Sequence, residues 1–156
     1  MAAPGRVHRY TARCNWTGST ANGYERYTRD HTAAASPARG ALTISADPAF
    51  HGDAEYLNPE QLLVIAAASC QLLSFLALAA RSRITVLSYE DDAEGEMPED
   101  NHPTRIATIR LRPQITVASG TDHARALRLV ERAHQECYVA NSLTSTITIE
   151  PAIVST

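Results

Sequence analysis

Cys70 and Cys137 are the residues of this 156-residue chain whose type and setting offer chemistry. Cys70 lies inside a long apolar segment that starts at Asn58 and Pro59, and Cys137 ends a second segment of helical spacing. A single buried cysteine is usually an inert small hydrophobic residue. Two thiols on two helices that face one core, with Glu60 opening the first helix, predict a reactive pair and therefore redox chemistry.

The Cys70 thiol would need help to ionise. It lies about twelve residues into its helix, and the helix dipole acts only over the first turn. Burial among apolar side chains would raise the pKa of this thiol. We therefore expect a cation from another element, and the candidates are Arg26 and Arg29 on a predicted strand. Because they are three residues apart, they point to opposite faces of a strand, and one of them can line a given site.

Glu60 is the expected carboxylate partner of that arginine. Ten helical residues separate Glu60 from Cys70, which is about 15 Å along the axis. On a straight helix the two side chains cannot touch. Either the arginine spans the gap, or Glu60 comes from a second subunit, which would make an interdigitated dimer. The alternative is that Glu60 only stabilises the start of the helix electrostatically.

Cys137 is the candidate resolving thiol. A sulfenic acid on one cysteine condenses with a nearby thiol to form a disulfide, provided that the two Cα atoms lie within roughly 4.4–6.8 Å. His134-x-x-Cys137 is also half of a metal-binding pattern, but the chain has no second pair at short spacing. A cysteine–histidine hydrolase has no supporting oxyanion-hole signature. Phosphate loops and dinucleotide-binding glycines are absent from the sequence, so we expect neither a metal nor a cofactor.

The composition narrows the function classes. All 14 basic residues are arginine, so chemistry that needs lysine is excluded. The net charge of −3 gives no reason to expect nucleic acid or an anionic membrane as a partner. The first ten residues have no apolar core of a secretory signal, so we expect a cytoplasmic location, where cysteines are usually reduced.

The elements that must position the two thiols follow from periodicity. Asn58 suits a helix N-cap and Pro59 the first helical position, so we expect a helix to about Arg81. Its stretch 61–80 is long and uncharged enough to span a bilayer, but its polar residues favour a buried central helix. A second helix starts after Thr121 or Asp122 and carries an apolar stripe to Cys137.

The strands are predicted from alternation of polar and apolar residues. We expect strands over 7–16, 24–31, 41–45, 84–89 and 108–117 and a last strand containing Ile147 and Ile149. The first strand places Cys14 on its apolar face, as a core residue. Pro113 has no backbone N–H to donate, so we expect its strand at the edge of a sheet or with a bulge. The resulting order, βββ-α-ββ-α-β, predicts one α+β domain over residues 1–156, with two core helices against antiparallel sheets.

The motifs that surround the thiols resemble the OsmC/Ohr family, the osmotically inducible and organic hydroperoxide resistance proteins. The resemblance rests on Asn58–Leu63, a run of small residues to Ser69-Cys70, and Ala133-His134-x-x-Cys137 with Asn141-Ser142. It covers residues 10–151 in the same element order. It implies an intertwined α+β homodimer with two active sites at the interface and a thiol-dependent peroxidase activity on organic hydroperoxides.

The resemblance also implies roles for single residues. Cys70 resembles the peroxidatic cysteine, Cys137 the resolving cysteine and Glu60 the carboxylate partner of the arginine. Arg29, followed by Asp30, matches the family arginine better than Arg26 does. The chain departs from the hydroperoxide-resistance branch in two places: Tyr138 and Val139 follow Cys137 where that branch typically has Pro-Tyr, and the Gly-Gly before the arginine is missing. The chain therefore resembles an OsmC-like subgroup.

Two functions of different classes remain open at this point. The first is a peroxiredoxin-like cysteine peroxidase that reduces organic hydroperoxides in oxidative stress defence and is recycled by an external thiol or dithiol. The second is a non-catalytic dimer that keeps the fold and binds a small apolar ligand. The reactivity of the Cys70 thiol toward peroxide would discriminate between them.

Overall fold

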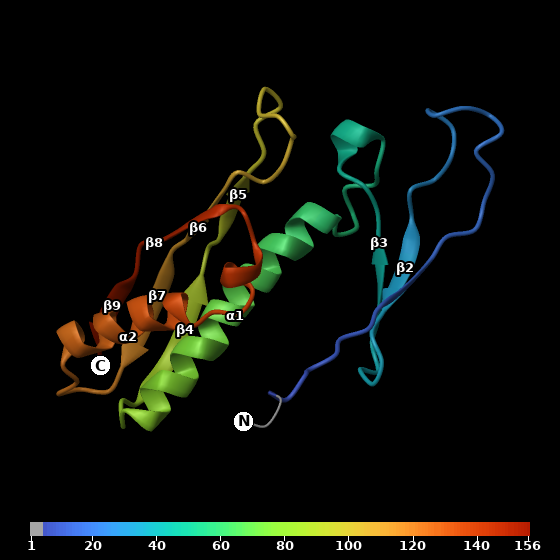
Figure 1. Ribbon diagram of the computed structural model, residues 1–156. Coiled ribbons are helices and arrows are strands. Elements are labelled where there is room, and N and C mark those ends of the chain that lie inside the picture. Colours follow the sequence, from blue (N-terminus) through green and yellow to red (C-terminus); the bar gives the residue numbers. More distant parts are fainter. Residues whose placement is uncertain (1–4) are drawn as a thin grey trace. The chain divides into compact units, whose positions relative to one another are not determined.

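A computed structural model describes residues 5–156 and divides into two compact units, a first that ends at Pro59 and a second from Glu60 to Thr156 (Figure 1). The first unit holds an antiparallel sheet in the order β1-β2-β3. Its strands are β1 (Arg13–Asn15), β2 (His31–Ala34) and β3 (Ala41–Ile44), followed by the short 3₁₀ helix η1 (Pro48–Phe50). The single domain over residues 1–156 stays a prediction.

The strands of the first unit are shorter than predicted. Only three residues of the expected strand 7–16 pair with β2, and residues 24–30 form turns and irregular backbone instead of a strand. The reason is a tertiary contact, since the indole Nε1 of Trp16 donates to the carbonyl oxygen of Thr28 at 2.8 Å and fixes the turn. The prediction that Cys14 is a core residue is wrong, because Cys14 is exposed.

The long helix α1 (Pro59–Arg81) has the predicted bounds. Its buried residues recur every three or four positions and so form one face; they are Ala67, Gln71, Phe75, Leu78 and Ala79. By length and composition α1 could also cross a membrane, a test that core helices of soluble proteins pass as well. The opposite face leaves Leu73 63% exposed, so the expected burial applies to one side of the helix.

Two three-stranded sheets support the helices of the second unit. One has the order β4-β7-β9, with β4 (Val86–Asp91), β7 (Pro113–Val117) and β9 (Ala152–Ser155). The other has the order β5-β6-β8, with β5 (Glu94–Glu96), β6 (Thr108–Leu111) and β8 (Thr146–Ile149). Pairs β6–β8 and β7–β9 are parallel, so the sheets are mixed where antiparallel sheets were expected. The α+β class is confirmed.

Strand β7 corrects the expectation for Pro113. It pairs with β4 on one side and with β9 on the other, so it is the central strand. Pro113 is tolerated because it is the first residue of that strand, at the break that separates β6 from β7. Strands β5 and β9 were not predicted, because the acidic sequence of β5 has no apolar alternation.

The second helix, α2 (His123–Gln135), completes the core. Asp122 is its N-cap, and its side chain accepts a hydrogen bond from the backbone N–H of Arg125 at 3.1 Å. The apolar stripe of α2 packs with α1 and β7 in one cluster, which includes Phe75, Ile115 and Val130. This packing of two helices on the strands determines where the chain places Cys70 and the segment after α2 (Figure 1).

Candidate thiol site

The two cysteines meet beside the end of α2. Cys70 lies in the middle of α1 and is half-buried, whereas Cys137 follows the C-cap residue Glu136 and is only 1% exposed. The predicted stripe ended on Cys137, but the helix ends two residues earlier. Both cysteines are free thiols, and they lie near enough for each to shift the pKa of the other. The structure therefore brings together the pair that the sequence singled out.

Hydrogen bonds lower the pKa of the Cys70 thiol below its ordinary value. Burial is the largest single influence and raises this pKa. It is outweighed by four donors to the sulfur, namely the backbone N–H groups of Val139 and Tyr138, the Cys137 thiol and the Ser74 hydroxyl. Donors to a charged sulfur favour its thiolate form. The stabilisation expected from an arginine is thus partly supplied by the second unit itself.

The pKa of Cys137 is shifted in the opposite direction. Burial raises it most, and the neighbouring Cys70 raises it further through the hydrogen bond and its charge. The backbone N–H groups of Ala140 and Val139 act against this rise. The Ala140 nitrogen lies 3.5 Å from the Cys137 sulfur. The two opposite shifts favour ionisation of Cys70 before that of Cys137.

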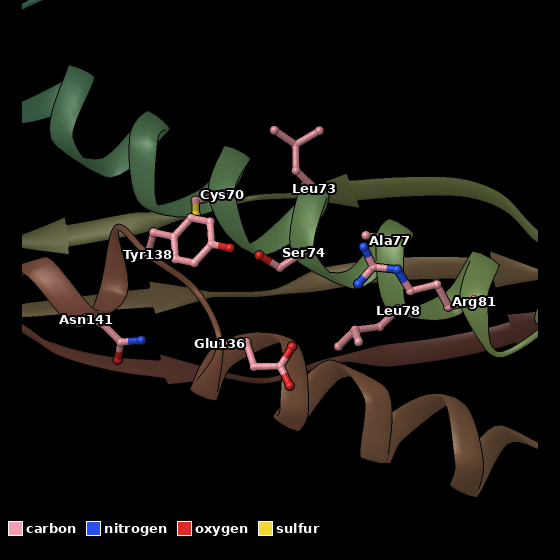
Figure 2. Close-up of a pocket in the computed structure, with 9 residues that line it drawn as sticks. All are labelled: Cys70, Leu73, Ser74, Ala77, Leu78, Arg81, Glu136, Tyr138 and Asn141. Carbon is pink, nitrogen blue, oxygen red and sulfur yellow. The ribbon is translucent and has the colours of Figure 1, made fainter. Parts of the chain in front are cut away.

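A pocket of about 650 Å³ opens beside Cys70. It follows one face of α1 and is closed by residues after α2 (Figure 2); its lining consists of Cys70, Leu73, Ser74, Ala77, Leu78, Arg81, Glu136, Tyr138 and Asn141. Figure 2 shows Ser74 one turn beyond Cys70, and the Arg81 side chain directed back toward Ala77. The lining between the thiol and Arg81 is apolar apart from Ser74. A small molecule with an apolar body can reach the sulfur here.

The contacts of the predicted arginine and carboxylate are described within each unit. Arg29 belongs to the first unit, where it donates to the backbone carbonyls of Tyr27 and Tyr24 and lies 3.9 Å from the centre of the Tyr27 ring. Arg26 is exposed. Glu60 is half-buried in the first turn of α1 and forms no ion pair with another residue of the range 5–156. The roles of Arg29 and Glu60 stay predictions.

Sequence reasoning missed the other groups that contact the thiols. Ser74 follows Cys70 by four residues, and this helical spacing could have identified it. The donors at positions 138–140 are backbone groups, which no residue type reveals. Across residues 5–156, no group of three or more metal-ligating side chains lies together.

Fold and site together define a class of protein, an α+β protein with two neighbouring free thiols, one of which lines a pocket. The family model of the OsmC-like proteins matches residues 52–152, and the chain belongs to that family. Its fold is similar to that of an OsmC-like protein of unknown function from Vibrio cholerae, with a TM-score of 0.82 and 26% identity over 95% of this chain and 100% of the other.

Two further relatives span almost the whole chain. The uncharacterized protein YmaD of Bacillus subtilis is 22% identical over 146 residues, which are 92% of this chain and 91% of YmaD. The organic hydroperoxide resistance protein from Elizabethkingia anophelis has a TM-score of 0.71 at 16% identity, covering 97% of this chain and 99% of its own. At such identity the likeness concerns the fold.

Proposed function

We propose that this protein is a thiol-dependent peroxidase that reduces organic hydroperoxides in oxidative stress defence. The observation that carries the proposal is the proximity of Cys70, whose pKa is lowered, to the buried thiol of Cys137. A thiolate is the nucleophile that peroxide chemistry needs. A second thiol in contact is what converts a sulfenic acid into a disulfide.

The reaction runs in two steps before recycling. The Cys70 thiolate attacks the outer oxygen of a hydroperoxide, the O–O bond breaks, and the alkoxide leaves and takes a proton to become the alcohol. Cys70 is then a sulfenic acid, oxidised by two electrons. The Cys137 sulfur attacks it, the S–S bond forms, and the S–O bond breaks with release of water. An external thiol or dithiol reduces the disulfide.

The pocket supports an organic substrate rather than hydrogen peroxide. Its apolar lining next to Cys70 includes Leu73, Ala77 and Leu78, and burial of apolar surface favours an alkyl group. We assign Arg29 and Glu60 to the same site as further stabilisers of the thiolate, a role that Arg29 would perform after leaving or reorienting its contacts with Tyr24 and Tyr27.

We further propose a homodimer in the cytoplasm. The exposed face of α1 carries large apolar side chains, among them Ile65, Leu73 and Leu76. Contiguous apolar surface of this kind is typical of protein–protein interfaces. A second copy of the chain would cover it and would place a second set of charged residues near the first thiol pair.

Stopped-flow oxidation of the reduced protein by cumene hydroperoxide tests the activity. We expect fast oxidation of the wild type, none beyond background for Cys70→Ser, and a stop at sulfenic acid after about one equivalent for Cys137→Ser, trapped with dimedone. Cys14→Ser is the matched control, since Cys14 lies exposed in the other unit. A wild type that reacts no faster than free cysteine would contradict the proposal and favour a non-catalytic binder of small ligands in the 650 Å³ pocket.

A further inference from the structure

A buried glutamine joins the helix of one thiol to the helix that leads to the other. Gln71 follows Cys70 in α1 and is 1% exposed. Its Nε2 donates to the backbone carbonyl of Val130 in α2 at 3.0 Å, between positions 59 residues apart in the sequence. Because Cys137 follows the C-cap of α2, this hydrogen bond links the two elements that present the sulfurs.

A gain in stability does not explain why a glutamine occupies this position. Its Oε1 is buried and has no hydrogen-bond partner among residues 5–156, and an unpartnered buried polar atom costs free energy of folding. The carbonyl of Val130 does not depend on Gln71 either, because in a regular helix it also accepts the N–H of residue 134. What the amide adds is a fixed distance and direction between α1 and α2.

We propose that Gln71 is a positioning residue, which sets where the end of α2 lies along α1 and thereby holds Cys137 beside Cys70. The inference rests on the proposed function and adds to it a residue that acts through the helices rather than on a sulfur. Its effect is expected in the step that joins the two cysteines.

Apolar packing by itself limits the sliding of α2 along α1 only weakly. The cluster that joins α1, α2 and β7 includes Ala79, Ala126 and Ala133. Small side chains form low ridges on a helix, and low ridges resist displacement along a neighbouring helix less than large side chains do. A hydrogen bond of 3.0 Å to a backbone oxygen is directional, so it restrains this displacement.

The position of α2 is passed on to Cys137 by hydrogen bonds on both sides of that residue. The backbone N–H of Cys137 donates to the carbonyl of His134 at 3.2 Å, and that of Asn141 donates to the carbonyl of Cys137 at 3.0 Å. The Asn141 side chain donates from Nδ2 to the carbonyl of Gln135 at 3.0 Å. Cys137 is therefore tied to the last turn of α2, and a shift of that turn moves its sulfur.

Disulfide formation is the step that needs this alignment. A disulfide tolerates only a narrow range of separation and direction between its two cysteines. A displacement of about 1 Å can slow a reaction between oriented groups by up to about a hundredfold. In the attack of Cys70 on a hydroperoxide, Cys137 is not a reactant. Loss of the Gln71 hydrogen bond should therefore slow the second step much more than the first.

Gln71→Met tests the role, because methionine has a similar length and lacks both the donor and the buried oxygen. Every protein compared carries Cys14→Ser, so that the pair alone is oxidised. The reduced protein is equilibrated with glutathione and glutathione disulfide. The pair gives two electrons and two protons to one glutathione disulfide, which forms the protein disulfide and two glutathione molecules. Mass spectrometry after acid quenching gives the equilibrium constant, which reports how well the sulfurs are aligned.

A second measurement follows the steps of the peroxide reaction. Stopped flow gives the oxidation of Cys70 by cumene hydroperoxide, and quench-flow gives the conversion of sulfenic acid to disulfide. We expect Gln71→Met to lower the glutathione equilibrium constant and to slow this conversion, each about tenfold. The first step and the urea midpoint should stay close to those of the parent protein.

Two further variants make the result specific. Gln71→His supplies a ring N–H donor of similar reach and should recover most of both effects. Gln135→Met makes the same chemical change at an exposed glutamine of α2 and should match the parent protein in every measurement.

The outcomes distinguish this inference from the proposed function. Disulfide formation that is as fast and as favourable in Gln71→Met as in the parent would overturn the positioning role and leave the peroxidase intact. A clearly lower urea midpoint, or equal slowing of both steps, would show a structural role instead and overturn it as well. A parent protein that cumene hydroperoxide does not oxidise would overturn the peroxidase, and the glutathione equilibrium would then still decide whether Gln71 aligns the thiols.

Discussion

At the scale of single residues, the site depends on an unequal pair of thiols. Each thiol affects the pKa of the other, yet burial dominates at Cys137 and hydrogen-bond donors dominate at Cys70. This inequality fits the separate roles proposed for the two sulfurs. The residue types pointed to the two cysteines, but the backbone amides that act on their pKa values have no residue type of their own.

Ser74 provides one test at this scale. Its hydroxyl donates to the Cys70 sulfur from the next turn of α1. Because this donor favours the thiolate, Ser74→Ala raises the Cys70 pKa, by about one unit for a lost hydrogen bond to a charged group. At a pH between the Cys70 pKa of wild type and the higher Cys70 pKa of the variant, Cys70 is mostly thiolate in wild type and mostly thiol in Ser74→Ala. The midpoint of iodoacetamide alkylation measures the shift.

The control for Ser74 is Ser69→Ala on the same helix. Ser69 is exposed and does not line the thiol pocket. The midpoint of Cys70 alkylation in Ser69→Ala should therefore match that of wild type. Ser74→Thr keeps a hydroxyl, so its midpoint of Cys70 alkylation should lie close to that of wild type. Equal midpoints for Ser74→Ala and wild type would remove Ser74 from the site.

Arg29 provides a second test. If it stabilises the thiolate as proposed, Arg29→Ala slows oxidation by cumene hydroperoxide about tenfold or more, while the free energy of unfolding changes little. Arg26→Ala is the matched control, an exposed arginine three residues away. Stopped-flow oxidation and urea denaturation measure the two effects. Unchanged peroxide kinetics in Arg29→Ala would show that the amides and Ser74 suffice.

At the scale of elements, two helices and one short segment determine the site. Helix α1 fixes Cys70, Ser74 and the pocket wall, and the end of α2 delivers Cys137. Both helices were predictable, because Pro59 and Asp122 mark their starts and the apolar spacing continues through them. The strands were predicted less well. The strand expected over 108–117 is divided at Arg112 into β6 and β7, and β9 pairs with β7, and both features depend on partners that are distant in the sequence.

The N-cap of α2 is testable at this scale. Asp122→Ala removes the bond to the Arg125 N–H and should lower the free energy of unfolding by about 1 kcal/mol. Urea denaturation measures the change. Asp122→Ser keeps a capping oxygen and should recover most of the loss, and Glu131→Ala on the exposed side of α2 is the neutral control. Identical midpoints for Asp122→Ala and wild type would contradict the capping role.

At the scale of the whole molecule, the face of α1 that the second unit does not cover carries large apolar side chains. A helix whose buried and exposed faces are both rich in apolar residues needs a partner on each. Inside the second unit the strands and α2 cover one face. The other face supports the proposed homodimer.

The dimer makes a measurable prediction. Sedimentation should give twice the chain mass of 16.9 kDa for wild type. Leu76→Glu places a charge on the exposed face of α1, outside the lining of the thiol pocket, and should shift the protein toward monomer. Leu127→Glu, on α2, is the control for an equally exposed leucine. A monomeric wild type at micromolar concentration would exclude this dimer.

The sequence by itself determined the two helices, the α+β class and the family, and it pointed to the two cysteines that lie together, because periodicity, capping residues and side-chain type are local properties. Only the tertiary structure decided which groups touch the sulfurs. A backbone N–H is chemically alike at every residue, so its partner depends on where the chain passes in space. The same holds for Cys14, whose alternating neighbours predicted a buried strand that the fold of the first unit does not form.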